Sequence, residues 1–186
     1  LQGSDKSGNT VAIINHPDVK RMLLDMKSKT EASRNIGIYT AACIDRSKRA
    51  PDEAQQALYR SRTELLTPVA KAWSTNIGID IASTGIQIHG GNGYVEETGA
   101  AQYLRDIRIA AIYEGTNGIQ AMDLIGRKLS MNNGESFNYF IGKMRETIEV
   151  AKEVKGIEGL VDKVSHAVTR LEVLAREIGQ RARSEK

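Results

Sequence analysis

The sequence has little of what builds disulfide-linked, metal-binding or membrane-spanning proteins. Its single cysteine, Cys43, excludes an intrachain disulfide and a cysteine-based zinc site. The three histidines, His16, His89 and His166, lack the spacing of metal ligands, so we expect no bound metal. No apolar run approaches the roughly 20 residues that a membrane-spanning helix needs, and no signal-peptide pattern opens the chain.

Aromatic residues, prolines and blocks of one charge are also scarce. Aromatic residues make up 5% of the chain and prolines number three, while alanine, leucine, lysine and glutamate are frequent, which favours an all-α fold. The net charge of +3 and the isoelectric point near 9.0 come from charges spread along the chain. Because no basic block stands out, we expect no nucleic-acid binding.

The spacing of apolar residues predicts an antiparallel helical bundle over residues 1–130. Apolar side chains recur every three to four residues over 18–47, which indicates a long amphipathic helix. Asp52 can cap a second helix that runs to about residue 66, and Pro68 is expected to separate it from a third helix over 69–88. Thr98 can cap a fourth helix to about residue 110, and a fifth covers 117–129.

Residues 131–186 are predicted to form a second, helical region. A polar linker over 131–135 precedes helices over 136–155 and 158–183, and the second of these has one apolar face that needs a partner. In the bundle we expect Cys43 to be a buried thiol, Trp73 a core residue, and Tyr94 and Tyr113 packing residues.

A glycine cluster, Gly90, Gly91 and Gly93, follows the predicted third helix. Glycines so placed allow a sharp bend and let backbone N–H groups approach a ligand, often a phosphate. The simpler interpretation is a helix end without any ligand, which is the commoner role of isolated glycine pairs.

A single carboxylate, Glu114, stands between the apolar stretch 109–113 and Gly115. We expect the apolar neighbours to dehydrate this carboxylate partly and so to raise its basicity. The alternative is an ordinary glutamate at a helix start, stabilised by the helix dipole. Upstream, Arg105, Asp106 and Arg108 can form either an anion clamp or a structural ion-pair network, and the network is favoured.

Three motifs, in this order and at this spacing, resemble the C-terminal helical domain of the acyl-CoA dehydrogenases. They are QIHGGNGY at 87–94, RDIR at 105–108 and IYEGT at 112–116. The resemblance extends back to HPDVKRMLLDM at 16–26 and forward to about residue 129. Residues 136–186 look like the start of the additional helical region that longer family members carry.

The resemblance implies an α,β-dehydrogenation of a fatty acyl-CoA thioester with FAD as cofactor. Glu114 matches the base that removes the α-proton, while the β-hydrogen leaves as hydride to FAD N5. The backbone N–H of Gly115 matches the group that contacts the thioester carbonyl of the substrate. Thr116, Asn117, Gly118 and His16 match positions near FAD; several members have glutamine in place of Gly118, and some have it in place of Pro17.

The family also implies subunits that share their sites. The segment formed by Gln87, Ile88, His89, Gly90 and Gly91 matches a contact to the ADP portion of FAD in a neighbouring subunit, so we expect a homodimer or homotetramer. Electron-transferring flavoprotein would be the redox partner, and the cytoplasm, or the mitochondrial matrix in a eukaryote, the compartment.

The family enzyme has an N-terminal helical domain and a middle β-domain that do not occur in these 186 residues. We therefore expect this chain to be a piece of a longer enzyme, with negligible dehydrogenase activity alone and weak or no FAD retention. Two alternatives remain open, an acyl-CoA oxidase-like flavoprotein domain and a non-catalytic helical scaffold for oligomerisation.

Overall fold

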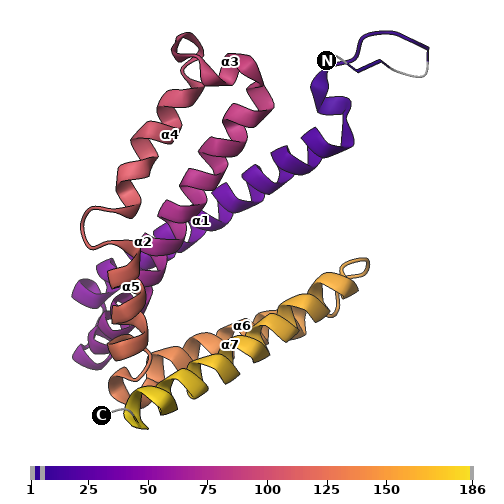
Figure 1. Cartoon of the computed structure of the whole chain (residues 1–186). Coiled ribbons are helices and arrows are strands. Elements are labelled where there is room, and N and C mark those ends of the chain that lie inside the picture. Colours follow the sequence, from indigo (N-terminus) through magenta and orange to yellow (C-terminus); the bar gives the residue numbers. More distant parts are fainter. Residues whose placement is uncertain (1–2, 5–6, 185–186) are drawn as a thin grey trace. The chain divides into compact units, whose positions relative to one another are not determined.

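The computed structural model describes residues 3–4 and 7–184, and these form an all-α fold, as predicted (Figure 1). Apart from one isolated bridge between Ser4 and Thr10, the described residues form no β-structure. The α-helices are α1 (Pro17–Arg49), α2 (Glu53–His89), α3 (Gly91–Tyr94), α4 (Ala100–Arg108), α5 (Asn117–Asp123), α6 (Glu135–Ala151) and α7 (Glu158–Ser184). Short turns of 3₁₀-helix form η1 (Ile13–Asn15), η2 (Glu96–Thr98), η3 (Ile109–Ala111) and η5 (Met131–Gly134), and α5 continues into the π-helical η4 (Leu124–Lys128).

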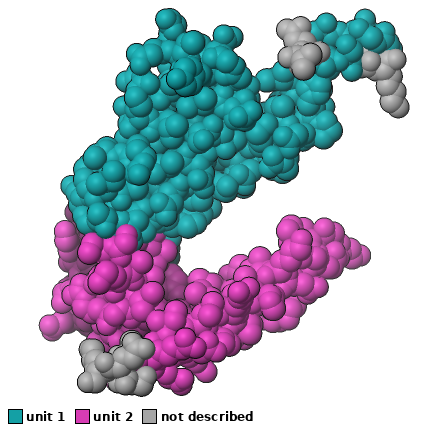
Figure 2. All heavy atoms as spheres, in the orientation of Figure 1, with its two compact units in different colours: residues 1–39, 70–117 teal, residues 40–69, 118–186 magenta. Residues whose placement is uncertain are grey.

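The chain forms two compact units, shown in different colours in Figure 2. Unit 1 comprises residues 1–39 and 70–117, and unit 2 comprises residues 40–69 and 118–186. Both α1 and α2 run through the two units, so the division does not follow the predicted boundary at residue 130. The predicted boundary separates two domains of the sequence, which compact units do not test, so it stays a prediction.

Within unit 1, α4 returns alongside the second half of α2, and the α3 and η2 turns connect them (Figure 1). The approach is close because α2 has a glycine at the crossing. A Cβ atom on Gly78 would lie 2.8 Å from Cγ1 of Ile107 in α4. The first half of α1 covers another side of α2, where Gly85 faces Met26. Glycine at position 78 lets two helix backbones approach each other, whereas a Cβ atom on Gly85 would make an ordinary contact, 3.8 Å from the Met26 side chain.

The start of α2 follows the prediction, but its interior does not. Asp52 accepts a hydrogen bond from the Gln55 backbone N–H at 2.8 Å, so it caps the helix as expected. The predicted break at Pro68 is wrong, because α2 continues without interruption from residue 53 to residue 89. Proline removes one backbone hydrogen bond, but Leu65, Leu66 and Pro68 are all buried in unit 2, and the packing of this stretch maintains the helix.

Unit 2 has its apolar core between α6 and α7, which run antiparallel and pack along their length. The buried side chains of this core are Ile141, Ile148, Val161 and Val168, with Phe137, Ala151 and Ile157 packed against them. Elsewhere in unit 2, Cys43 is buried with 1% of its surface exposed, as predicted for an unreactive thiol.

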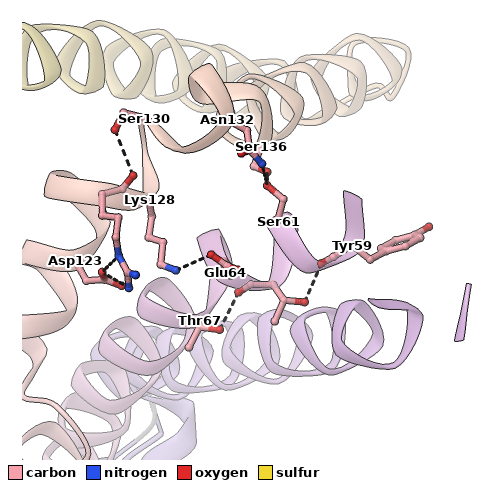
Figure 3. Close-up of polar contacts among 11 residues, drawn as sticks. Tyr59, Ser61, Glu64, Thr67, Asp123, Lys128, Ser130, Asn132 and Ser136 are labelled. Atoms are coloured by element: carbon pink, nitrogen blue, oxygen red, sulfur yellow. Dashed lines mark hydrogen bonds and ion pairs between the residues drawn. The ribbon is translucent and has the colours of Figure 1, made fainter. Parts of the chain in front are cut away.

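Polar contacts join α2 to the η5 turn and to the start of α6 in unit 2 (Figure 3). The hydroxyl groups of Ser61 and Ser136 lie 2.5 Å apart, and Asn132 donates to Ser61 at 3.2 Å. Asn132 and Asn133 both have left-handed backbone conformations, so the expected linker is a tight turn. None of the helices in the described residues is both long enough and apolar enough to cross a membrane.

Candidate functional site

The predicted glycine bend forms directly after α2 and depends on glycine at two positions. Gly90 has φ 61° and ψ −143°, a conformation close to the region that only glycine occupies readily. Gly93 is buried, and a Cβ atom there would lie 2.4 Å from the backbone oxygen of Ile86. The turn closes through a hydrogen bond from the Gly93 N–H to the Gly90 carbonyl, at 2.9 Å.

The segment 87–91 leaves its backbone open to contact. Gln87, His89, Gly90 and Gly91 are exposed, and Ile88 is half-buried. A Cβ atom on Gly90 or Gly91 would meet nothing within 4 Å, so both glycines face open space. His89 is the last residue of α2, and its Nδ1 atom lies 2.7 Å from the Gly85 carbonyl oxygen.

The structure contradicts the predicted Thr98 cap and gives Arg105 an ion pair. Thr98 does not cap α4, because Gly99, with φ 74°, precedes that helix and the Thr98 hydroxyl donates to the Asn92 carbonyl at 2.6 Å. The prediction of a threonine cap is therefore wrong. Arg105 forms an exposed ion pair with Glu96 at 3.3 Å, which agrees with the structural interpretation of this motif.

The IYEGT motif, residues 112–116, forms a turn that carries Glu114 out of the helical bundle of unit 1. η3 ends with the N–H groups of Ile112 and Tyr113 bonded to the Ile109 carbonyl. Glu114 and Gly115 then have φ values of 53° and 83°, so two consecutive residues are left-handed. This conformation is unfavourable for a glutamate, and the surrounding structure must compensate for it.

We expected the apolar neighbours to shield the Glu114 carboxylate, but in this chain they do not. Glu114 is exposed, and Ile112 and Tyr113 beside it are 49% and 53% exposed. The apolar run fails to cover the carboxylate because the turn reverses at Glu114 and directs these side chains outwards. The expectations of a packed Tyr94 and Tyr113 and a core Trp73 are also wrong within this chain, with Tyr94 81% and Trp73 37% exposed.

A polar network ties this turn to α2. The ammonium group of Lys71 donates to the Gly115 carbonyl at 2.7 Å and to Oδ1 of Asn117 at 2.9 Å. The Asn117 amide nitrogen lies 2.9 Å from the Thr75 hydroxyl and 2.8 Å from Oδ1 of Asn76. The Asn117 head group is therefore fully used, and a contact to a cofactor through its side chain would require these bonds to break.

Lys71 and Thr75 were not among the residues expected at the site. They lie four positions apart and therefore on one face of α2, in a stretch rich in alanine and small polar residues. A lone lysine between Ala70 and Ala72 is the sequence signal that could have identified this contact.

The remaining predicted residues lie in unit 1 or at the start of unit 2. Thr116 and Gly118 are exposed and flank the network just described. His16 is half-buried at the start of α1, and its buried Nε2 atom has no hydrogen-bond partner among the described residues. Its ring lies against Gly3, where a Cβ atom would not fit.

The structure does not bring the two motifs together in one chain. Lys71 touches the turn that carries Glu114, and His89 lies 18 residues further along α2. At 1.5 Å per residue this separates the glycine bend from the Glu114 turn by about 27 Å. One chain therefore presents two distinct surfaces, at opposite ends of the second half of α2.

Two surface hollows lie away from these motifs. A hollow of about 400 Å³ lies at the α1–α2 connection, and one of about 300 Å³ lies between α6 and α7; neither includes a predicted site residue. Within the described part of the chain, no group of three or more histidine, cysteine, aspartate or glutamate residues could hold a metal ion.

Comparison with known proteins identifies the family of this chain. The family "Acyl-CoA dehydrogenase, C-terminal domain" matches residues 4–129. The 3-methylmercaptopropionyl-CoA dehydrogenase of Ruegeria pomeroyi is 42% identical over 163 residues, which cover 88% of this chain and 26% of that protein. A butyryl-CoA dehydrogenase of Syntrophomonas wolfei is 36% identical over 147 residues, covering 79% of this chain and 24% of that protein.

A solved structure with a similar fold comes from a protein of the same kind by name. The crystal structure of Caenorhabditis elegans ACDH-11 in complex with C11-CoA superimposes with a TM-score of 0.65 at 24% identity, over 91% of this chain and 32% of that chain. The chain belongs to the acyl-CoA dehydrogenase family, whose C-terminal helical domain it matches. It spans about a quarter of the length of the curated relatives.

Proposed function

We propose that this chain provides the catalytic base of an FAD-dependent acyl-CoA dehydrogenase, which oxidises the Cα–Cβ bond of a fatty acyl-CoA thioester. The observation that carries the proposal is the turn at Glu114 and Gly115. It presents one carboxylate and one glycine backbone at a left-handed turn that α2 supports through Lys71. Membership of the family makes an acyl-CoA thioester the expected substrate.

The reaction assigns one step to each of these two residues. Glu114 takes the pro-R α-proton, and the electron pair of that C–H bond moves toward the thioester carbonyl. The backbone N–H of Gly115 donates to that carbonyl oxygen and stabilises its developing negative charge. FAD, when bound, supplies the acceptor for the β-hydride at N5, so that a Cα–Cβ double bond forms.

Several described residues fit FAD. The open backbone at Gly90 and Gly91 suits close contact with a pyrophosphate, since no side chain stands in the way. Among the described residues nothing bonds to the buried Nε2 atom of His16, and a cofactor atom would provide a partner. Gln87, Ile88 and His89 belong to the bend, while Thr116, Gly118 and the backbone of Asn117 belong to the Glu114 surface.

The distance of about 27 Å along α2 supports a shared site. One cofactor next to Glu114 and a second next to the glycine bend would belong to two active centres, so residues 87–91 are assigned to the FAD of a neighbouring subunit. The assembly would be a homodimer or homotetramer.

The exposure of Glu114 indicates what the rest of the enzyme must provide. A base in bulk water is weak, so other domains or subunits must exclude water from this carboxylate. We therefore propose that the chain alone neither retains FAD nor turns over acyl-CoA, and that reduced FAD passes its electrons to electron-transferring flavoprotein.

Substitution of Glu114 in the complete enzyme tests this function. Glu114→Gln should lower turnover of acyl-CoA by about 10²-fold to 10⁴-fold, since an amide cannot accept the proton. Glu97→Gln is the matched control, because Glu97 is an exposed glutamate on the η2 turn, away from the Glu114 turn. Unchanged turnover in Glu114→Gln would favour a non-catalytic scaffold, and reoxidation by oxygen faster than by electron-transferring flavoprotein would favour an oxidase.

A further inference from the structure

The contact between Lys71 and Gly115 is an unusual use of a lysine. Lys71 is half-buried, and its ammonium group donates to a backbone carbonyl and to an amide oxygen, both neutral. Among the described residues, no ion pair includes Lys71, whereas surface lysines such as Lys143 and Lys152 each pair with a glutamate. The positive charge is thus directed at the turn that follows Glu114.

The acceptor, Gly115, directly follows Glu114 in the turn. Glu114 and Gly115 are both left-handed, at φ 53° and 83°. A glutamate relaxes from such a conformation unless its neighbours prevent it, because the left-handed region is crowded for side chains with a Cβ atom. A change of φ at Glu114 would redirect the carboxylate relative to the Gly115 N–H.

Asn117 secures the other side of the same turn. Its amide group contacts the Ala72 carbonyl at 3.2 Å and the Thr75 hydroxyl at 2.9 Å, and its oxygen accepts from Lys71. The turn is therefore attached to one face of α2 at two points, the Gly115 carbonyl and the Asn117 side chain. Lys71 contacts both.

We propose that Lys71 is the positioning residue for Glu114. By holding the Gly115 carbonyl and the Asn117 side chain against α2, its ammonium group maintains the left-handed pair that aims the Glu114 carboxylate and the Gly115 N–H in a fixed relation. Lys71 acts through the backbone and takes no proton. The effect on catalysis rests on the proposed function, but the effect on the turn does not.

Nuclear magnetic resonance of the full 186-residue chain tests the conformational part. A positive φ brings the amide proton of Glu114 close to its own Hα and gives a strong intraresidue Overhauser effect. We expect this signal in the wild type, its loss or marked weakening in Lys71→Met, and partial retention in Lys71→Arg. Lys29→Met is the matched control, because Lys29 is a half-buried lysine on α1 that bonds to Asp25.

Asn117→Leu provides a second variant in case Lys71→Met fails to fold. It removes the amide that attaches the turn to Lys71, Ala72 and Thr75 of α2 but leaves the bond from Lys71 to the Gly115 carbonyl possible, so the Glu114 signal should weaken less than in Lys71→Met. An unchanged Glu114 signal in folded Lys71→Met would overturn the proposal. If only Asn117→Leu folds, an unchanged Lys71–Gly115 contact with a lost Glu114 signal would also overturn it.

Kinetics of the complete, FAD-loaded enzyme tests the catalytic part. Lys71→Met should lower kcat by about 10-fold to 100-fold with little change in KM, as expected for misplacement of a reacting group, and Lys71→Arg should recover part of the loss. The temperature of unfolding should match that of Lys29→Met. A kcat equal to the wild type would overturn the role of Lys71 in catalysis, whereas unchanged turnover in Glu114→Gln would refute the proposed function and leave the conformational result intact.

Discussion

Lys128, in the π-helical turn η4, donates to Oε2 of Glu64 in α2 at 3.0 Å, and 92% of the lysine side chain is buried (Figure 3). The two residues are 64 positions apart in the sequence. The contact attaches the segment after α5 to the first half of α2 and satisfies a buried cation in unit 2.

Removing the carboxylate should therefore cost more than removing the lysine. Glu64→Ala leaves an unpaired buried ammonium group and should lower the free energy of unfolding by about 1–3 kcal/mol, below the cost for a fully buried pair because Glu64 is 43% exposed. Lys128→Met should lower the free energy of unfolding by less, since the apolar methionine side chain fits the buried space of the lysine. Urea unfolding of the chain measures both, and a larger loss in Lys128→Met would contradict this account.

The glycine bend allows a second comparison between adjacent residues. Gly90→Ala should lower the free energy of unfolding by about 1–3 kcal/mol, because alanine is strained at φ 61° and ψ −143°. Gly91→Ala should change it by less than about 0.5 kcal/mol, since Gly91 is not left-handed and a Cβ atom there meets open space. Equal effects of the two substitutions in thermal unfolding would show that the bend does not need the Gly90 conformation.

The start of α7 should make stability depend on acid pH. The Gly156 N–H donates to the Glu158 carboxylate, and this bond, with a further one from the Glu158 backbone, lowers the pKa of Glu158 below its ordinary value of 4.5. A carboxylate with a lowered pKa stabilises the fold above pH 4.5, and the contribution disappears as the pH falls through the folded-state pKa.

Two measurements check this dependence. A carbon-detected titration should give a midpoint below 4.5 for Glu158. Glu158→Gln should be less stable than the wild type at pH 7, and the difference should vanish in strong acid. A titration midpoint at or above the ordinary value, or a difference that persists at low pH, would refute the contribution of this hydrogen bond.

Local signals in the sequence were sufficient where residues close together in the sequence decide the structure. The three-to-four spacing predicted a helix over 18–47, close to the observed Pro17–Arg49, and Asp52 caps α2 as expected. The bend at Gly90 was also predicted, because a left-handed turn after a helix strongly favours glycine.

Features that depend on residues distant in sequence could not be predicted in this way. Pro68 lies inside a continuous helix because burial around it outweighs one missing hydrogen bond. Arg62, only 7% exposed, stacks 3.7 Å above the ring centroid of Tyr139, and nothing near Arg62 in the sequence indicates that partner. The exposure of Glu114 is a further example, because the apolar run before it did not reveal that Ile112 and Tyr113 are exposed beside the carboxylate.

Exchange of the substrate α-hydrogen with deuterated water tests the central claim most directly. An acyl-CoA analogue without β-hydrogens cannot transfer hydride, so in the complete, FAD-loaded enzyme its exchange reports proton removal alone. We predict exchange in the wild type and in Glu97→Gln, and a loss of about 10²-fold to 10⁴-fold in Glu114→Gln with analogue binding retained. Exchange at the wild-type rate in Glu114→Gln would contradict the assignment of Glu114 as the base.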